Sequence, residues 1–304
     1  MAVIALDLGG TKLGAAIVSS RGKILYKHVA ALAGRKGTQV FALITRELKG
    51  LFAFARARKI QVRGIGISVP GICYSKTGKV WAPNVPGWNN FPLRDRIIAV
   101  APKKIPVTIE SDRACYILGD AWLGSARGCN DAIFLAIGTG IGAGILVDGK
   151  ILRGANDIAG AIGWLALAPP WLSKYKSCGC FEYHASGAGL VNGSRSSRYR
   201  SAEEIFRAYE AGAPDAKSVL NQAVQFWGMA AANLVSLFNP QKIIFGGGVF
   251  GPARRLLPQI MVEAKKWAQP LSIGKVKFEV SKLGGDAGLY GAACLALQAR
   301  GNTG

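Results

Sequence analysis

One glycine-turned hairpin pattern occurs twice in this 304-residue chain and constrains its fold more than any other feature. The first copy, Val3–Ser20, is an apolar run, a Gly-Gly-Thr-Lys turn and a second apolar run. The second copy, Ala132–Leu152, repeats this order, and both copies lead into the same four residues, Gly-Lys-Ile-Leu. Because internal repeats set the architecture of a chain, we predict an α/β protein of two similar lobes. Each lobe is expected to offer one glycine loop to a shared cleft, where small ligands commonly bind.

The turn of the first hairpin has the residue types of a phosphate-binding loop. Gly9 and Gly10 lack a Cβ, so backbone N–H groups can approach an anion closely. Thr11 and Lys12 add a hydroxyl and a positive charge. Asp7, at the end of the preceding strand, is placed to hold a hydrated Mg²⁺ on a phosphate chain. An ordinary hairpin turn with an exposed lysine fits this stretch equally well, and the second copy favours the phosphate loop.

Composition and hydropathy indicate a globular protein of the cytoplasm. Half of the residues are apolar, which excludes a disordered chain. No apolar run reaches the roughly 18–20 residues of a membrane span without a charge or glycine break. Asp7 follows only six residues, so we expect no secretory signal peptide. The six cysteines are mostly isolated in apolar or helical contexts, which indicates a reduced protein without a disulfide framework.

The chain is strongly basic, with 38 Lys and Arg against 17 Asp and Glu and a formal net charge of +21. Such a charge favours anionic partners, namely nucleotides, sugar phosphates, polyphosphate or nucleic acid. A solvated basic surface is the alternative interpretation. The aromatic-interleaved basic motifs of RNA-binding modules are absent from the sequence, so a nucleic-acid partner is not expected.

A carboxylate follows a strand predicted over Val107–Glu110. Ser111 and Asp112 begin a helix that runs to about Leu123, and a carboxylate at a helix N-terminus is ordinarily a cap. In front of a hydroxyl-bearing substrate, the same carboxylate can accept the proton as the hydroxyl attacks a phosphoryl group. Asp112 is therefore a candidate general base.

Two loops are candidates for contacts with ligands. The segment after Pro70-Gly71 is polar, aromatic and fixed by prolines, as in a carbohydrate pocket, although a structural loop with packed tryptophans fits as well. It contains Trp81, Asn84, Pro86, Gly87, Trp88 and Asn89. Later in the chain, the predicted strand Lys242–Phe245 leads into Gly246–Gly248 and then a helix, where a flat ligand or a phosphate can approach the backbone.

Other patterns predict structure or exclude a function. Apolar residues at helical spacing predict long helices over Thr38–Lys59, with Thr38 as N-cap, and over Ala216–Phe238. The segment Gly138–Ala143 fits the loose dinucleotide fingerprint, but a strand rather than a helix follows it, so no NAD site is expected. One Cys-x-Cys, Cys178 to Cys180, with one nearby histidine falls short of the four ligands of a structural zinc site.

The order of motifs along nearly the whole chain resembles the ROK (repressor, open reading frame, kinase) sugar kinases, within the actin-like/hexokinase ATPase superfamily. The matching motifs are DLGGTK at 7–12, PG at 70–71, APNVPGW at 82–88, ESD at 110–112, GTGIGAG at 138–144, GAND-AG at 154–160, C-x-E-x-x-x-S at 180–186, GGG at 246–248 and GDAGLYGAA at 285–293. The resemblance implies two ribonuclease-H-like lobes that close on ATP·Mg²⁺ and a hexose in the cleft between them. The N-terminal lobe is expected over 1–120, completed by a C-terminal helix at 287–304, and the C-terminal lobe over 121–286.

The resemblance also implies a role for each matching residue. The first phosphate loop comprises Asp7, Gly9, Gly10, Thr11 and Lys12, with Asp7 near the metal, and the second comprises Gly138, Thr139 and Gly140. Gly246, Gly247 and Gly248 would face the adenosine. The sugar would meet Gly71, Asn84, Ser111, Asp112, Trp164 and Glu182, with Asp112 as the base on the attacking hydroxyl. The reaction implied is in-line transfer of the γ-phosphoryl group, driven by positioning and charge neutralisation.

The sequence departs from the family pattern around the sugar. Family members usually have Asn before the catalytic Asp, where this chain has Ser111, and they read AGEIGH, where it has Ala161 and Trp164 in place of Glu and His. The cysteine-rich zinc loop is shortened, so we do not expect bound zinc. Each lost polar anchor is worth about 1–3 kcal/mol when its hydroxyl partner is present. The pocket is thus expected to suit a less hydroxylated or differently shaped acceptor, such as an amino sugar, a cyclitol or a deoxysugar.

These features together predict an ATP-dependent phosphotransferase that acts on a hydroxyl of a hexose, amino sugar or cyclitol. Two alternatives stay open: a catalytically weak or inactive sugar-sensing ROK protein, and a sugar kinase that uses polyphosphate, which the positive charge would help to hold. Family repressors carry a winged helix-turn-helix before the first hairpin, and here that hairpin begins at Val3, so we expect no DNA-binding domain. We expect a cytoplasmic homodimer, as is the family's habit.

Overall fold

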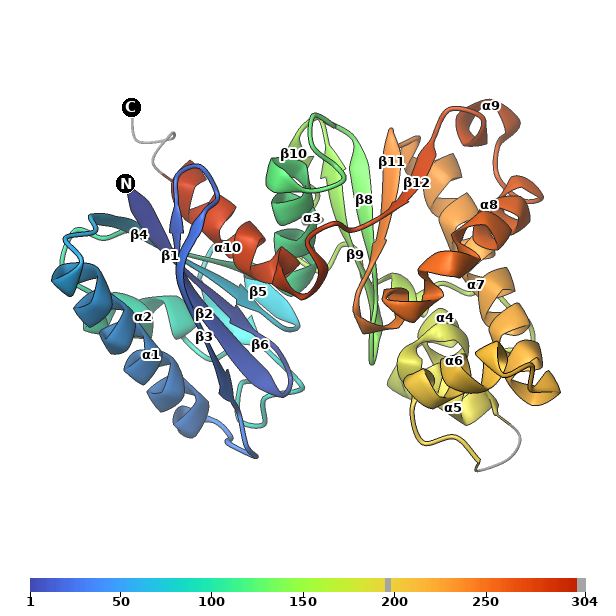
Figure 1. Ribbon diagram of the computed structural model, residues 1–304, viewed down its shortest axis with the longest axis horizontal. Coiled ribbons are helices and arrows are strands. Elements are labelled where there is room, and N and C mark those ends of the chain that lie inside the picture. Colours follow the sequence, from blue (N-terminus) through green and yellow to red (C-terminus); the bar gives the residue numbers. More distant parts are fainter. Residues whose placement is uncertain (195–197, 300–304) are drawn as a thin grey trace. The chain divides into compact units, whose positions relative to one another are not determined.

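The computed structural model describes residues 1–194 and 198–299, which form two compact units (Figure 1). Unit 1 comprises Met1–Arg127, the short segment Arg153–Ala159 and the described residues from Asp286 to Ala299. Unit 2 comprises Gly128–Leu152 and Gly160–Gly285. The segment Arg153–Ala159 therefore packs with unit 1, although its neighbours on both sides in the sequence belong to unit 2.

Unit 1 is built on a five-stranded sheet of order β3-β2-β1-β4-β7. Its strands are β1 (Ala2–Leu8), β2 (Lys12–Ser19), β3 (Ile24–Ala31), β4 (Val62–Val69) and β7 (Val107–Ser111). The first three strands are antiparallel, whereas β4 and β7 run parallel to β1. A separate small hairpin pairs β5 (Ile72–Tyr74) with β6 (Lys79–Trp81). The hairpin predicted over Val3–Ser20 is thus confirmed as β1 and β2.

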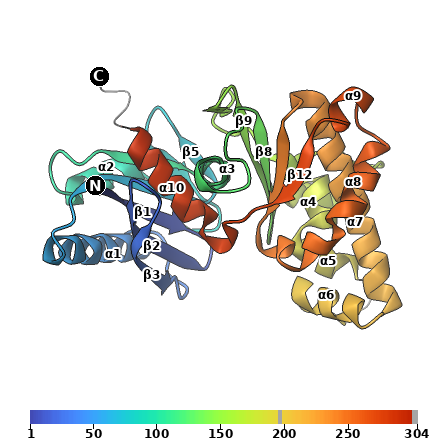
Figure 2. The ribbon, with the colours of Figure 1, turned by 45° about the horizontal axis from the view of Figure 1, so that its top comes forward.

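Helices cover both faces of this sheet, and the alternation of side chains along β1 explains why. Ile4 and Leu6 belong to the core cluster that also contains residues of α1 (Thr38–Ala57) and α2 (Leu93–Val100). Val3 and Ala5 pack instead with Leu289 and Ala292 of α10 (Ala287–Gln298). Successive side chains of a strand point to opposite faces. On the second face, α10 packs against α3 (Asp112–Leu123), and the two lie side by side in both views (Figure 1, Figure 2).

Unit 2 repeats this plan with a sheet of order β10-β9-β8-β11-β12. Its strands are β8 (Ala132–Ile137), β9 (Ile141–Val147), β10 (Lys150–Ile151), β11 (Lys242–Gly246) and β12 (Lys277–Val280). Here too the first three strands in the chain are antiparallel and the last two run parallel to β8. The equivalent strand orders confirm that the two glycine-turned hairpins are copies of one architectural unit.

The helices of unit 2 pack mainly around one long helix, α7 (Pro214–Phe238), which is buried along most of its length. In both ribbon views α7 and α8 (Leu257–Lys265) cover the same face of the sheet. Ile133, Leu135 and Ile137 of β8 share a core with Phe226 and Trp227 of α7. The remaining helices are α4 (Cys180–Ala185), α5 (Gly187–Gly193), α6 (Ala202–Glu210) and α9 (Pro270–Ile273), with 3₁₀ turns η1 (Ile162–Trp164) and η2 (Ser173–Ser177).

Several local predictions differ from the structure. The N-cap of α1 is Gly37 at φ 49°, with no side-chain cap, and the candidate cap Thr38 is instead the first residue of the helix. Gly246–Gly248 lead into two 3₁₀ turns, η3 (Gly248–Phe250) and η4 (Pro252–Leu256), before α8 begins, rather than directly into a helix. The C-terminal helix predicted over 287–304 is described to Gln298, and residues 300–304 lie outside the described chain.

In the described ranges 1–194 and 198–299, every helix is too short or too polar to cross a bilayer.

Candidate functional site

Asp7 is held on the α10 face of the unit 1 sheet by its position in β1. Parallel pairing places it opposite Ser68 of β4, and the Ser68 hydroxyl donates a 2.6 Å hydrogen bond to Asp7 Oδ1. Burial raises the pKa of the Asp7 carboxyl, while the Ser68 hydrogen bond and the positive charge of Lys12 oppose that rise. Ser68 is itself fully buried, so its hydroxyl is fixed in place and its hydrogen bond holds the Asp7 carboxylate in this orientation.

Gly288, in the first turn of α10, makes room for the Asp7 carboxylate. A Cβ added at Gly288 would lie 2.5 Å from Asp7 Cγ, which is shorter than real Cβ contacts allow. The helix therefore approaches the strand closely only because this position lacks a side chain. The sequence showed Gly288 as part of a family-like motif, but its contact with Asp7 could not be read from the sequence.

The first glycine loop connects β1 to β2 at one end of the sheet. Gly9 N–H donates to Lys12 O at 2.9 Å, which closes the turn, and Thr11 O accepts the Leu32 N–H at 2.8 Å. Gly10, Thr11 and Lys12 are exposed. The loop is therefore anchored through its backbone, and its hydroxyl and ammonium groups face solvent.

Asp7 also fits a magnesium ion bound together with phosphates. Mg²⁺ prefers oxygen ligands and usually keeps waters while binding one or two carboxylates. Across the described residues, no group of three or more His, Cys, Asp or Glu side chains is placed to hold a metal ion. A single carboxylate beside a glycine loop therefore suits an ion held through water and phosphate oxygens rather than an all-protein cage.

Asp112 is the first residue of α3, and the structure corrects its expected capping role. The N-cap is Ser111, whose Oγ accepts the Ala114 N–H at 3.4 Å, while Asp112 Oδ1 accepts the N–H of Arg113 at 2.8 Å. Burial raises the pKa of the Asp112 carboxyl to about 6; the charge of Asp7 adds to the rise and Arg113 opposes it. A half-buried carboxyl with this pKa is suited to accept a proton near neutral pH.

An ion pair supports the backbone just before Asp112. Glu110 is buried, and its Oε2 lies 2.7 Å from Arg153 Nη2. Its other oxygen, Oε1, accepts the Ser111 N–H at 2.9 Å. Arg153 begins the segment that packs with unit 1, and Asp157 of the same segment accepts the Ser75 N–H at 3.1 Å. No local sequence pattern indicates this pair, because its members are 43 residues apart.

The other residues predicted in unit 1 lie on loops. Gly71 has φ +90°, and a Cβ there would collide with the Trp81 carbonyl oxygen, so only glycine fits the turn. Asn84 is exposed, and its Cβ lies 3.9 Å from the position that a Cβ on Gly10 would occupy. Unit 1 therefore brings Asn84 beside the first glycine loop. Trp88 of the same segment is buried and stacks on Phe91 at 4.6 Å between ring centroids, as a structural tryptophan does.

In unit 2, the second glycine loop joins β8 to β9. Gly138 N–H donates to Gly140 O at 2.9 Å, and Gly138 O accepts the Gly187 N–H at 2.7 Å. A Cβ on Gly138 would lie 3.9 Å from the backbone nitrogen of Gly248. The structure thus brings the 138–140 loop next to the Gly246–Gly248 turn at the ends of neighbouring strands. Gly247 has φ +88°, which favours glycine at that turn.

Glu182 of α4 lies against the same loop. Its Oε2 accepts the Ile141 N–H at 2.6 Å, and a Cβ on Gly140 would lie 2.8 Å from that oxygen. Burial raises the pKa of the Glu182 carboxyl, and the Ile141 hydrogen bond opposes the rise. Trp164, at the end of η1, has 57% of its surface exposed. The side chain of Trp164 is therefore available for contacts beyond the protein core.

Cys180 and His184, which belong to the partial zinc motif of the sequence, have other contacts. His184 Nε2 lies 2.8 Å from the Tyr175 hydroxyl, and the His184 ring stacks on Phe226 with centroids 4.5 Å apart. Cys180 is buried, and its Sγ lies 3.9 Å from Ala168 O. Burial lowers the pKa of His184. These side chains pack unit 2 through rings and backbone contacts.

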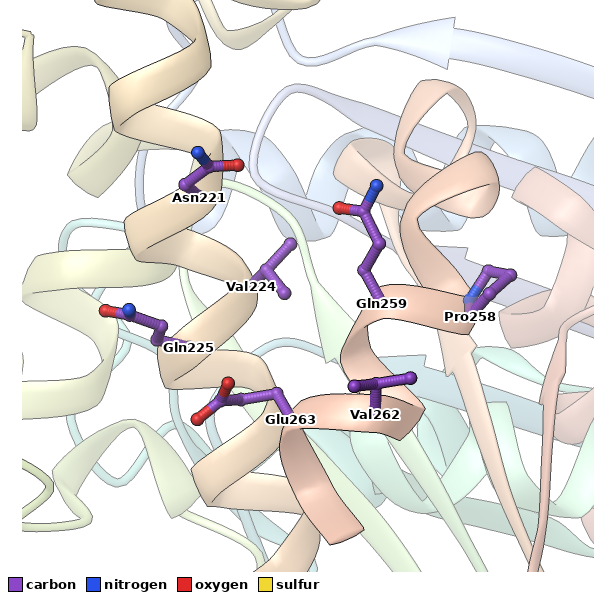
Figure 3. A pocket seen from close by; sticks show the side chains of 7 residues that line it. All are labelled: Asn221, Val224, Gln225, Pro258, Gln259, Val262 and Glu263. Atoms are coloured by element: carbon purple, nitrogen blue, oxygen red, sulfur yellow. The ribbon is translucent and has the colours of Figure 1, made fainter. Parts of the chain in front are cut away.

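A surface pocket of about 440 Å³ lies between α7 and α8, away from the predicted site residues. Figure 3 shows Asn221, Val224 and Gln225 on one helix and Pro258, Gln259, Val262 and Glu263 on the other. Glu263 already binds Lys266 Nζ at 2.6 Å and Trp267 Nε1 at 2.9 Å. The pocket presents mostly amides and apolar groups, so it does not offer the chemistry of a phosphoryl-transfer site.

Comparison with known proteins supports the architecture. The profile of the ROK family matches residues 3–299. A glucokinase of Halalkalibacterium halodurans is 30% identical over 319 residues, which cover 97% of this chain and 94% of the relative. The crystal structure of a ROK hexokinase from Thermus thermophilus is 30% identical, covers 99% of this chain and 100% of its own, and gives a TM-score of 0.82.

A ROK family glucokinase from Streptomyces griseus, solved in complex with glucose and AMPPNP, is 28% identical. It aligns with a TM-score of 0.78 over 98% of this chain and 100% of its own. The chain therefore belongs to the ROK family and has the α/β fold of the actin-like ATPases.

Proposed function

We propose that this protein is an ATP-dependent carbohydrate kinase in which Asp112 is the general base. The observation that supports this most directly is the environment of Asp112, a half-buried carboxyl whose pKa is raised to about 6 by burial and by the negative charge of Asp7. The names of relatives support the same reaction class, since a relative 30% identical is a glucokinase. The glucokinase structure that holds glucose and AMPPNP supports a sugar acceptor and a nucleoside triphosphate donor.

In the proposed reaction, Asp112 accepts the proton of the acceptor hydroxyl while that oxygen forms a bond to the γ-phosphorus. The bond from the γ-phosphorus to its bridging oxygen breaks, and the nucleoside diphosphate leaves. At pH 7 a carboxyl with a pKa of about 6 is about 90% ionised, so the base is in its active form. Its raised pKa also makes it a better proton acceptor than an ordinary aspartate.

The glycine loops are proposed to bind the phosphates through backbone N–H groups, with Thr11 and Lys12 adding a hydroxyl and a charge. Asp7 would hold a magnesium ion through water, and the bound ion would neutralise charge on the phosphate oxygens. Ser68 keeps the Asp7 carboxylate in one orientation. Gly246–Gly248 are proposed to lie against the nucleoside, and Glu182 and Asn84 against the sugar.

The decisive experiment is a panel of hexoses, amino sugars, deoxysugars and cyclitols assayed with Mg-ATP for ADP release. We expect at least one acceptor to be phosphorylated, and Asp112→Asn to lower kcat at least about 100-fold, since general-base catalysis contributes about 10²–10⁴. Asp95→Asn is the matched control, because Asp95 is an exposed carboxylate in the first turn of α2. Intact ATP binding with no product from any acceptor would contradict the proposal.

Two variations on this function follow from specific observations. Ala161 and Trp164 remove the polar groups that family members place near the sugar, which favours a weak kinase or a sugar sensor as second candidate. Binding of a sugar with turnover no higher than in Asp112→Asn would support the sensor.

The net charge of +21 favours polyphosphate as a further phosphoryl donor, and a comparison of turnover with ATP and with polyphosphate tests this alternative. Sedimentation velocity tests the proposed homodimer.

A further inference from the structure

A cavity of about 570 Å³ in unit 2 is lined mainly by aromatic and apolar side chains. Trp164 and Trp171 stand at its wall with 57% and 64% of their surfaces exposed. Ala166, Ala168, Pro169 and Cys180 add to the apolar lining. Exposed apolar surface rimmed by indole rings is typical of a binding site rather than of a solvated surface. The cavity volume lies in the range of small-molecule sites, about 300–1,000 Å³.

The polar groups of this wall are few and mostly engaged. The Tyr175 hydroxyl lies 2.8 Å from His184 Nε2, and Cys180 Sγ lies against Ala168 O. Lys176 is the one cationic side chain among the described lining residues, and its ammonium lies 5.8 Å from the ring centroid of Trp171. A second sugar ring would bury hydroxyls without enough partners, which is costly. An aromatic or comparably apolar group needs no such partners and gains from stacking on indole.

The cavity shares its backbone with Glu182. Cys180 lines the cavity and begins α4, the helix that carries Glu182. Trp164 follows Gly163, where an added Cβ would lie 3.0 Å from both Glu182 Cβ and Oε2. Gly179 packs beneath Trp164, since a Cβ there would lie 2.6 Å from Trp164 Cα. The cavity therefore lies close to Glu182 along two chain segments. Cys180 precedes Glu182 by two residues, and Trp164 directly follows Gly163, which contacts Glu182.

We propose that this cavity binds an aryl or similarly apolar group carried by the sugar acceptor, so that the preferred substrates are aryl glycosides rather than free sugars. The inference rests on the proposed function, because it requires the sugar itself to lie at Glu182. Trp164 and Trp171 then determine specificity for the substituent through their ring faces. The Lys176 ammonium lies beside the Trp171 ring and would contact the outer edge of the bound group.

The test uses the sugar that is the best acceptor of the panel. Turnover is compared for its methyl glycoside, for its phenyl glycosides of both anomers and for a disaccharide that contains it. For the wild type we expect kcat/KM to be about tenfold higher with one phenyl glycoside than with the methyl glycoside. Trp171→Ala should abolish most of this advantage. Trp267→Ala is the matched control, because Trp267 is 61% exposed and lies on the α8 side of unit 2, outside the cavity lining.

Isothermal titration calorimetry with the phenyl glycoside in the absence of ATP separates the two proposals. Trp171-dependent binding without any turnover would contradict the kinase and support the cavity. Turnover with the same phenyl-to-methyl ratio in the wild type and in Trp171→Ala would overturn the cavity proposal and leave the kinase intact. A preference for the disaccharide would also overturn it, as would a Trp171→Ala protein that changes only its oligomeric state in sedimentation velocity.

Discussion

Arg153 reaches back to Glu110, and its Nη2 lies 2.7 Å from Glu110 Oε2. The Arg153 Nε donates to the same oxygen at 2.8 Å, while Glu110 Oε1 accepts the Ser111 N–H. The pair therefore fixes the backbone of the residue that precedes Asp112. It also ties the segment Arg153–Ala159 to unit 1, although that segment lies between two parts of unit 2 in the sequence.

Arg153→Met should destabilise unit 1 and disturb Asp112 together. Removing the arginine leaves the buried Glu110 without its charge partner, which costs about 3–5 kcal/mol for a fully buried pair. Because the Arg153 side chain is 40% exposed, we expect a smaller loss, about 1–2 kcal/mol, in chemical denaturation. Arg198→Met is the control, since the exposed Arg198–Asp215 pair at 3.5 Å should contribute less than about 0.5 kcal/mol. Equal losses in the two variants would contradict the prediction.

The pKa of Asp112 predicts the acid limb of the activity profile. With a pKa of about 6, kcat/KM should fall tenfold for each pH unit below about 6, because the protonated carboxyl cannot accept the hydroxyl proton. The residual activity of Asp112→Asn should show no such limb, and Asp95→Asn should keep it. A wild-type profile that stays flat down to pH 4.5 would exclude Asp112 as the titrating base.

The same pKa predicts how stability depends on pH. The folded pKa of about 6 lies above the ordinary value of 3.8, so this group favours the folded state when protonated and loses that contribution as pH rises through 6. Asp112→Asn removes the buried charge and should raise the free energy of unfolding at pH 7.5 by about 2 kcal/mol. At pH 4 the difference from the wild type should shrink. Guanidinium denaturation at both pH values measures it, and a variant less stable than the wild type at pH 7.5 would contradict the account.

Gly288→Ala should displace Asp7. The added methyl would lie 2.5 Å from Asp7 Cγ, so either α10 or the carboxylate must shift, at a cost of about 1–3 kcal/mol. We expect a lower melting temperature and a loss of activity with Mg-ATP. Gly285→Ala is the matched control, because a Cβ there meets no atom within 4 Å. Full activity in Gly288→Ala would show that the position of the Asp7 carboxylate is not critical.

Ser68→Ala should weaken the use of Mg-ATP without unfolding the protein. The serine donates to Asp7 Oδ1 at 2.6 Å, and a hydrogen bond to a charged group is worth about 1.5–3 kcal/mol. Its loss should raise the pKa of Asp7 further and increase the apparent KM for Mg-ATP roughly tenfold. The effect should be relieved as pH rises. Thr108→Val, which removes a hydroxyl that donates to the Ile65 carbonyl at 3.3 Å, is the control.

Local sequence patterns determined most of the secondary structure of this protein. The apolar runs and glycine turns of Val3–Ser20 and Ala132–Leu152 predicted the two antiparallel hairpins, since both the strand alternation and the turn depend on neighbouring residues. The repeat between them predicted two sheets of equivalent strand order. Cap positions were less predictable. The N-cap of α1 is Gly37 rather than Thr38, because the loop enters the helix with a positive φ of 49° at that residue.

Only the tertiary structure decided which groups surround the candidate site residues. Ser68 meets Asp7 because β1 and β4 pair in parallel across 61 residues, and Gly288 meets Asp7 because α10 returns from the far end of the chain to cover β1. The pKa of Asp112 follows from burial and from the nearby charge of Asp7, which no local pattern encodes. A residue's type is set by the sequence, whereas its desolvation and partners arise from long-range packing, and these determine its chemistry.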